Sequence, residues 1–287
     1  MKHEGGVSGW TSLICAAYLG DVNAVKDNLH ERGRKDIIGK TALMWAAHQG
    51  YTEVAKIVLP HEDPTDKNGV TALMRAAASG DAEMVELLAP LQKGAKDKDG
   101  NTALVFAARA GQGAMLELLD PTDEDGVTAL MRAAMRGDVE AVRALIPLQK
   151  GETALCVNAN ESWIYGGTAL MMAAAYGHTE VVKLLVEYEG GMRDNYSYAA
   201  LMFAAKRGHT DCVELLLEKE GGMRNEEGFT ALMLAIFGAH TECVKLLAEK
   251  EKDIKTTHGL RRFPPGLTAL DFAREKGCTE IISILIG

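Results

Sequence analysis

Versions of a ten-residue motif, T-A-L-M-x-A-A-x-x-G, occur nine times along the 287 residues, and their spacing constrains the fold more than any other feature. The successive copies are separated by 30, 30, 31, 26, 40, 31, 31 and 38 residues. A period of about 20 to 50 residues is typical of a solenoid, in which each unit packs on its neighbours. We therefore expect an all-α chain of repeated units. The copies begin at Thr11, Thr41, Thr71, Thr102, Thr128, Thr168, Ala199, Thr230 and Thr268.

The unit that starts at Thr168 predicts two short helices that meet at a glycine. The Thr168 hydroxyl can cap the first helix, and Gly177 supplies the left-handed residue that ends it. Each helix carries an apolar stripe, and the paired alanines let neighbouring helices approach closely. One unit cannot bury this face alone, so the units are expected to stack. The stripes consist of Leu170, Met171, Ala173 and Ala174, and of Val181, Val182, Leu184 and Leu185.

Two further patterns flank the motif. Residues 66–71 (D-K-N-G-V-T) and 97–102 (D-K-D-G-N-T) form a turn before it, and G-H-T-E at 177–180 and G-H-T-D at 208–211 open the second helix. With these patterns the chain resembles the ankyrin-repeat family from roughly Gly6 to Ile286. The resemblance implies an ankyrin-repeat solenoid of about nine helix-turn-helix repeats with finger turns. Alanine stands at the family's usual proline and methionine often at its histidine, a variant similar to ankyrin-only proteins of some parasitic protists.

The spacing predicts one array over residues 6–287, with two insertions near 152–161 and 252–262. The long interval before Thr168 contains E-T-A-L at 152–155, which begins like a helix but lacks the alanines and glycine that should follow. Residues 152–165 are therefore either an extended finger or a degenerate miniature repeat. The repeats are expected near 6–35, 36–65, 66–96, 97–122, 123–150, 162–193, 194–224, 225–256 and 263–287.

Charge and composition exclude several classes of protein. The net charge of −9 argues against a nucleic-acid partner, because duplex binding requires a basic stripe. No stretch approaches the roughly 18 consecutive apolar residues of a membrane span, and Met1–Gly6 has no apolar signal core. The cysteines have no disulfide or zinc spacing, since Cys212 and Cys243 occupy equivalent places 31 residues apart. We expect an intracellular, cytoplasmic protein with reduced thiols.

Two patterns have both a chemical and a structural interpretation. His178, His209 and His240 recur every 31 residues, but equivalent residues of stacked repeats lie about 8 to 10 Å apart, too far to share one zinc ion. The turns at 97–100 (D-K-D-G) and 123–126 (D-E-D-G) are rich in aspartate, yet they lack the remaining ligands of a calcium loop. No nucleophile elbow, phosphate loop or H-E-x-x-H helix occurs. The sequence therefore predicts no enzyme, no cofactor and no metal.

The resemblance implies that the finger turns and the exposed ends of the first helices line one concave surface, on which partners bind. In repeats six to eight these positions hold aromatic side chains and an arginine, which dominate many protein interfaces. Alternatively, Tyr196 and Tyr198 only fill the place of the turn glycine missing at Ser197, and Trp163 only packs the insertion onto the array. The candidate partner-binding residues are Trp163, Ile164, Tyr165, Tyr176, Tyr196, Tyr198, Arg207, Phe229 and Phe237.

The function expected from these features is a non-catalytic scaffold or adaptor that binds a protein partner of unspecified identity. The alternative is a regulatory or targeting array for an enzyme such as a kinase, acting in trans or through a segment outside this sequence. A monomer is expected from the acidic charge. The apolar C-terminal residues Ile281–Ile286 offer a route to self-association.

Overall fold

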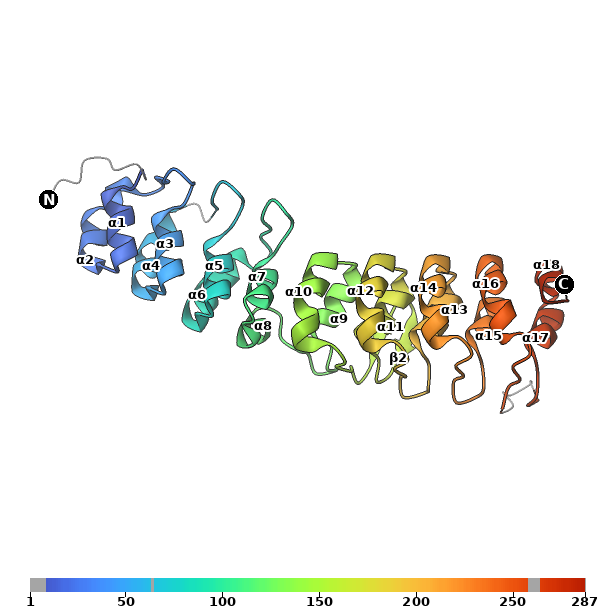
Figure 1. The fold of residues 1–287 in the computed structure, drawn as a ribbon. Coiled ribbons are helices and arrows are strands. Elements are labelled where there is room, and N and C mark those ends of the chain that lie inside the picture. Colours follow the sequence, from blue (N-terminus) through green and yellow to red (C-terminus); the bar gives the residue numbers. More distant parts are fainter. Residues whose placement is uncertain (1–8, 63–64, 258–263, 287) are drawn as a thin grey trace. The chain divides into compact units, whose positions relative to one another are not determined.

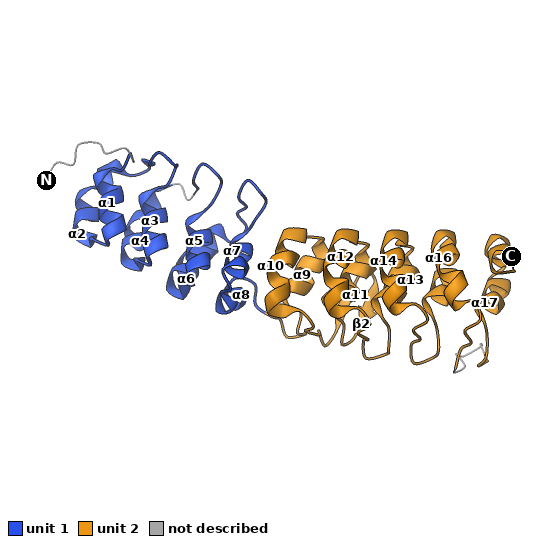
Figure 2. Ribbon diagram, in the orientation of Figure 1, with its two compact units in different colours: residues 1–121 blue, residues 122–287 orange. Residues whose placement is uncertain are grey.

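A computed structural model describes residues 9–62, 65–257 and 264–286. The described residues form helix pairs joined by turns, as an all-α repeat fold requires, together with one short hairpin. Contacts divide the chain into two compact units, residues 1–121 and 122–287 (Figure 2). The start of the first predicted repeat at residue 6 and residues 258–262 of the second predicted insertion lie outside the described residues.

In the first unit, one helix of each pair packs against the equivalent helix of the next (Figure 1). The first helices α1, α3, α5 and α7 follow one another, and so do the second helices α2, α4, α6 and α8. The helices are α1 (Ser12–Leu19), α2 (Val22–Asp27), α3 (Ala42–Gln49), α4 (Thr52–Val58), α5 (Ala72–Ser79), α6 (Ala82–Gln92), α7 (Ala103–Arg109) and α8 (Gly113–Leu119), with the 3-10 turns η1 (Leu29–Glu31) and η2 (Leu59–His61).

The second unit repeats this pairing and adds a β-hairpin between its first two helix pairs. The first helices again form one row and the second helices another (Figure 1). The elements are α9 (Ala129–Arg136), α10 (Val139–Gln149), β1 (Val157–Ala159), β2 (Ser162–Ile164), α11 (Ala169–Tyr176), α12 (Thr179–Glu189), α13 (Ala200–Arg207), α14 (Thr210–Glu220), α15 (Ala231–Phe237), α16 (Thr241–Glu251), α17 (Ala269–Lys276) and α18 (Thr279–Ile286).

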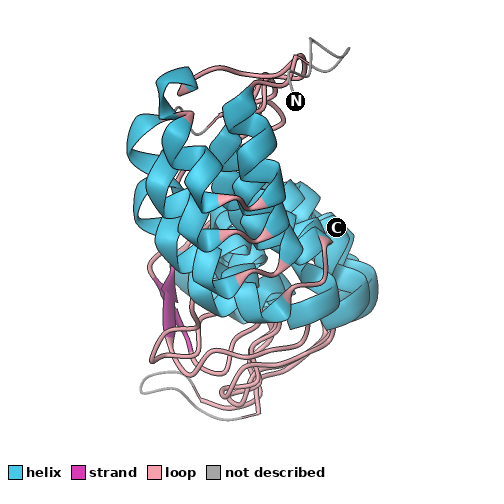
Figure 3. Cartoon of the chain, turned by 90° about the vertical axis from the view of Figure 1, so that its left-hand side faces the viewer, coloured by secondary structure: helices cyan, strands magenta, loops and turns pink. Residues whose placement is uncertain are grey.

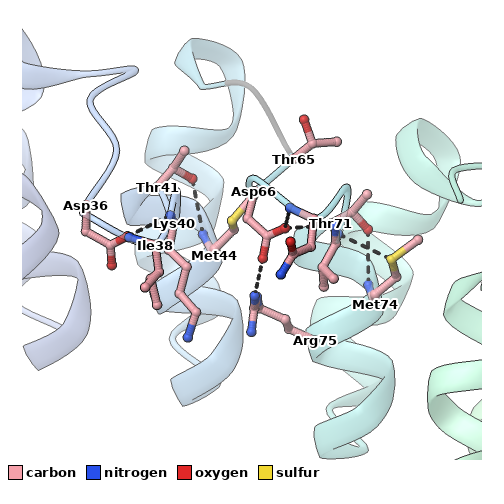
Figure 4. A network of polar contacts seen from close by, with 12 residues as sticks. Asp36, Ile38, Lys40, Thr41, Met44, Thr65, Asp66, Thr71, Met74 and Arg75 are labelled. Carbon is pink, nitrogen blue, oxygen red and sulfur yellow. Dashed lines mark hydrogen bonds and ion pairs between the residues drawn. The ribbon is translucent and has the colours of Figure 1, made fainter. Parts of the chain in front are cut away.

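The threonine and the methionine of the motif cap the start of several first helices. Thr71 Oγ1 accepts the Met74 N–H at 3.2 Å, and Met74 Sδ accepts the Thr71 N–H at 3.3 Å (Figure 4). Thr128 and Met131 make the same exchange. The thioether therefore does the work of the glutamate in an ordinary capping box. In the last repeat Asp271 takes this place, and its Oδ2 accepts the Thr268 N–H at 2.8 Å.

The predicted cap at Thr168 is wrong, because its side chain makes no cap hydrogen bond. A carboxylate from the far end of the same repeat serves the helix start instead. Glu189, at the end of α12, accepts the Leu170 N–H at 2.7 Å and the Gly151 N–H at 3.0 Å. Burial raises the pKa of Glu189, and these two N–H donors oppose the shift.

Other repeats use the same long-range cap. The side-chain acceptor lies 18 or 19 residues after the leucine whose N–H it receives, a relation that the sequence analysis missed. Glutamine fills the position in two repeats, so the fold accepts a neutral acceptor there. The pairs are Glu31 with Leu13, Glu62 with Leu43, Gln92 with Leu73, Gln149 with Leu130, Glu220 with Leu201, and Glu251 with Leu232.

The recurring histidines connect neighbouring repeats. His209 Nε2 lies 3.1 Å from the Ala175 carbonyl oxygen and His240 Nε2 lies 3.1 Å from that of Lys206, so each ring bonds the end of the preceding first helix. Gly177 ends α11 with a φ of 79°, as predicted. A Cβ on Gly177 would lie 2.5 Å from the His209 ring, so the glycine provides both the left-handed turn and the room for the histidine.

The long interval before α11 contains a β-hairpin. Of the two alternatives for residues 152–165, the hairpin corresponds to the extended finger and not to a degenerate miniature repeat. β1 and β2 are antiparallel, with Val157 opposite Ile164 and Ala159 opposite Ser162. Asn160 and Glu161 both have positive φ, as a two-residue type I′ hairpin turn requires. Figure 3 shows the strands as a separate pair beside the helices.

The finger turns are built on an aspartate or asparagine. Asp66 Oδ1 accepts the N–H groups of Asn68 at 2.8 Å and Val70 at 3.0 Å, and its Oδ2 binds Arg75 at 2.6 Å (Figure 4). Asp97 accepts two backbone N–H groups in the same way. The turn aspartates therefore use their oxygens to shape the backbone, which supports the turn interpretation over a calcium loop.

Candidate functional site

Consecutive finger turns of the second unit are joined by backbone hydrogen bonds. The Asn195 N–H donates to the Tyr165 carbonyl oxygen at 2.6 Å, and the Glu226 N–H donates to that of Tyr196 at 3.2 Å. Tyr165 and Tyr196 hold equivalent positions, three residues before the first residue of each motif. These hydrogen bonds between consecutive turns, which we call the turn ladder, bring side chains that lie about 30 residues apart in sequence into one row.

Tyrosine and tryptophan side chains of this row line a small pocket, which we call the aromatic pocket. Tyr165 and Tyr196 have ring centroids 5.5 Å apart with planes at 86°, and Tyr198 packs on Phe203 at 5.6 Å. The pocket has a volume of about 230 Å³. The aromatic pocket is lined by Trp163, Tyr165, Asp194, Tyr196, Tyr198, Phe203, Lys206, Glu226 and Glu227.

The aromatic side chains differ in how far they reach solvent. Trp163 is 61% exposed and Tyr196 is 50% exposed, whereas Tyr198 is half-buried. Burial raises the pKa of the Tyr198 hydroxyl, and the nearby Glu227 acts in the same direction. Rigid rings at such partly open positions bury much area on contact at little entropic cost. Trp163, Tyr165 and Tyr196 are therefore the side chains most available to a partner.

Carboxylates line the pocket from two successive turns. Asp194 is buried and accepts the backbone N–H groups of Tyr196 at 2.9 Å and Tyr198 at 2.7 Å, which fixes the backbone of the turn that carries both rings. Burial raises the pKa of Asp194. Glu227 accepts the Asn225 side-chain N–H at 2.7 Å. The turn of the next repeat thus presents acidic groups beside the rings.

Two basic side chains at the end of α13 hold the hairpin. Lys206 Nζ lies 3.4 Å from the Ser162 hydroxyl, and Arg207 donates to the same hydroxyl at 3.3 Å. Arg207 also binds Glu161 at 3.3 Å. Burial lowers the pKa of Lys206, and the adjacent Arg207 lowers it further. Arg207 therefore contributes to the site by holding the hairpin, whose strand β2 carries Trp163.

The candidate residues named from the sequence fall into separate places. Trp163, Tyr165, Tyr196 and Tyr198 gather in the aromatic pocket, and Arg207 supports its edge. Tyr176 lies outside the pocket lining and stacks on His178 at 6.0 Å.

Ile164 and Phe229 were wrong choices as contact residues, because both are buried. Ile164 is 0% exposed, since alternate residues of β2 face opposite sides and Trp163 takes the outer one. Phe229 is 3% exposed and packs on Phe272 at 5.3 Å. Phe237 is half-buried in the same cluster, 5.2 Å from Phe272. These phenylalanines join the last two repeats.

Several pocket residues were not named from the sequence. Phe203 occupies the fifth position of its motif, to which the sequence pattern assigned no role. Asp194, Glu226 and Glu227 lie in the turns before two successive motifs and were not among the candidates. Their spacing of about 31 residues from one turn to the next was the available signal, because the ladder places such residues side by side.

A second aromatic group lies in the first unit. Trp10, Tyr18 and Trp45 have ring centroids 5.0 to 5.5 Å apart, and Lys40 Nζ lies 3.9 Å from the Trp45 ring centre. Trp45 Nε1 donates to Asp36 at 3.1 Å. These half-buried rings cover one another and the turn, so they pack the first two repeats.

The described residues hold no group of three or more histidine, cysteine or acidic side chains arranged to bind a metal ion. Within the same residues, none of the helices combines the length and apolar character needed to cross a bilayer.

Comparison with known families gives one match. The family model described as ankyrin repeats in three copies matches residues 13–98, 61–121, 80–154, 115–191, 153–223 and 219–287. These overlapping matches cover both units and the hairpin. No curated protein matches the chain significantly.

Proposed function

Because this chain belongs to the ankyrin-repeat family, whose repeats generally mediate contacts between proteins, we propose that it is a non-catalytic scaffold or adaptor. The matched family is not a catalytic one. The partner binds at the aromatic pocket of the second unit. The observation that carries the proposal is the convergence of Trp163, Tyr165 and Tyr196 from neighbouring turns.

Three physical features support this surface over others. The turn ladder and Asp194 hold the backbone of the turns that carry the exposed rings, so little backbone entropy is lost when the rings are covered. Arg207 and Ser162 fix the hairpin that carries Trp163. Exposed aromatic side chains rimmed by polar groups mark interaction sites more often than isolated apolar residues do.

Affinity capture from native lysate tests the proposal. The unmodified chain is compared with a Trp163→Ala/Tyr165→Ala/Tyr196→Ala variant, called the aromatic variant, and captured proteins are identified by mass spectrometry. Tyr51→Ala/Tyr188→Ala is the matched control, since both tyrosines are exposed and lie outside the pocket. A protein that is captured by the unmodified chain and the control but not by the aromatic variant supports the proposal. The same set of captured proteins from all three chains would contradict it.

The identity of the captured protein distinguishes two roles. A structural or signalling protein fits an adaptor. A kinase or another enzyme would instead identify the chain as a regulatory or targeting array.

The proposed setting is intracellular, in the cytoplasm. All five cysteines are free thiols, and burial raises the pKa of Cys212 and Cys243, which keeps both protonated and unreactive.

The protein is proposed to act as a monomer. In α18, Ile281 and Leu285 are buried against the repeat, and Ile286 is exposed. Light scattering measures the mass of the protein in solution. A mass twice that of the monomer, which returns to the monomer mass in the Ile286→Lys variant, would contradict this proposal and identify α18 as the dimer contact.

A further inference from the structure

We infer that the aromatic pocket binds the positively charged side chain of an arginine or lysine in a partner protein. This inference rests on the proposed function and specifies the chemistry of the same site. It follows from what the pocket is made of, how large it is and where its charges lie.

The rings provide faces that attract a cation. A cation over the face of tryptophan or tyrosine is stabilised by the ring quadrupole, and tryptophan is the best of the three aromatic residues. Tyr165 and Tyr196 meet at 86°, so their planes form two walls of a corner. Trp163, on the adjacent strand, lines the same pocket and is largely exposed.

The charged groups favour the same ligand. Asp194, Glu226 and Glu227 place three carboxylates in the lining against one ammonium group, that of Lys206. A carboxylate has about four acceptor sites, so Glu227 can accept from a ligand as well as from Asn225. An anionic ligand such as a phosphorylated side chain would meet net repulsion here.

Lys206 lies at one end of the pocket rather than across it. Its ammonium group approaches Ser162 on the hairpin, whereas Glu226 and Glu227 belong to the turn of the following repeat. The turn with Tyr196 stands between them, joined to Tyr165 on one side and to Glu226 on the other. The cationic side chain is therefore expected between Tyr196 and the two glutamates, on the side of the turn away from the hairpin.

The size of the pocket points to a side chain. Sites for drug-sized molecules have volumes of about 300 to 1,000 Å³, and this pocket is smaller at about 230 Å³. The net charge of −9 also increases the rate of encounter with basic partners.

A random twelve-residue peptide library displayed on phage, selected on the full chain, tests the inference. Peptides retained by the chain and not by the aromatic variant are expected to share an arginine or lysine at one position. Replacing that residue by glutamine in the synthetic peptide should weaken binding about tenfold, measured by fluorescence polarisation.

A pair of charge variants separates the pocket carboxylates from the general acidity of the chain. Glu226→Gln/Glu227→Gln should weaken binding of the same peptide about tenfold. The control Glu214→Gln/Glu218→Gln removes the same charge from exposed positions outside the pocket. It should change the affinity for the peptide by less than twofold.

The outcomes distinguish this inference from the proposed function. Pocket-dependent peptides without a shared basic residue, or with affinity unchanged by the Glu226→Gln/Glu227→Gln variant, would overturn the inference and leave the binding surface intact. Peptides retained equally by the aromatic variant, or no selected peptide, would overturn both.

Discussion

The Glu189 carboxylate at the end of α12 accepts the backbone N–H of Leu170 at the start of α11, with a distance of 2.7 Å. One side chain thus closes a repeat on itself across 19 residues and also receives the Gly151 N–H from the preceding repeat. The local threonine cap is absent at this helix.

Glu189→Ala should lower the free energy of unfolding by about 1 to 3 kcal/mol, because the buried Leu170 N–H loses its acceptor. Glu187→Ala is the control on the same helix. The Glu187 side chain is 79% exposed, so its ion pair with Lys219 contributes little. Urea denaturation measures both variants, and equal losses would show that the long-range cap does not stabilise the repeat.

The pH dependence of stability should also report on these caps. Burial raises the folded-state pKa of Glu189, Glu220 and Glu251, so the folded protein binds protons more tightly than the unfolded chain. Their contribution is fully present below the ordinary pKa of 4.5 and is lost as pH rises through the raised folded pKa.

Glutamine at all three positions should remove this contribution and make the free energy of unfolding less dependent on pH. Gln92 and Gln149 already accept the equivalent leucine N–H in other repeats, so a glutamine oxygen can keep that bond. The second N–H that each glutamate accepts, from Gly151, Gly191 or Gly222, loses its acceptor, so the variant is expected to be less stable and the pH dependence alone is compared. The measurement is the difference in unfolding free energy between pH 7.5 and pH 5. Equal differences for the variant and the unmodified chain would exclude this role of the carboxylates.

Gly208→Ala should destabilise the protein, whereas Ala239→Gly should stabilise it by about 1 kcal/mol. Gly208 has a φ of 76° and its added Cβ would lie 2.5 Å from the His240 ring. Ala239 holds the equivalent place with a φ of 57°, and the next repeat has Cys278 where a histidine would stand. Thermal unfolding of both variants checks the prediction. A higher melting temperature for Gly208→Ala or a lower one for Ala239→Gly would refute it.

Arg75→Ala should cost about 1 to 3 kcal/mol, because the Asp66 carboxylate, whose side chain is only 5% exposed, loses its bond to the guanidinium and keeps its two backbone donors. Arg132→Ala is the matched change in the second unit, where the partner Asp123 is half exposed. That pair should contribute about 0 to 1 kcal/mol. Similar losses from both substitutions, measured by urea denaturation, would contradict the burial argument.

Phe229→Ala should lower the free energy of unfolding by about 3 to 5 kcal/mol, since the ring is buried against Phe237 and Phe272. Trp163→Ala should change it by less than about 0.5 kcal/mol, because the indole is largely exposed. Denaturation curves compare the two. A large loss from Trp163→Ala would mean that this ring only packs the hairpin onto the repeats.

The repeat period was enough to predict the helix pairs, because each motif contains its own turn and helix-ending signals. Gly177 is an example, and its left-handed conformation followed from the motif alone. The cap by Glu189 was not predictable in this way, because it joins residues that come together only when the two helices pack.

The candidate site could be predicted only in part, because some of its contacts form only when neighbouring repeats pack. Trp163, Tyr165, Tyr196 and Tyr198, which line the aromatic pocket, could be named as candidates because turn positions differ from repeat to repeat and are mostly exposed. Phe229 occupies the same register as Tyr198, yet it is buried by Phe272 from the next repeat. The strand alternation that buries Ile164 was hidden because residues 152–165 had two open interpretations.

The most direct test of the proposed binding surface is the affinity of a captured partner for the unmodified chain and for the Trp163→Ala/Tyr165→Ala/Tyr196→Ala variant. The account predicts that the dissociation constant rises by about 30-fold or more, equivalent to about 2 kcal/mol, with the melting temperature nearly unchanged. An unchanged dissociation constant in a variant that folds normally would contradict it.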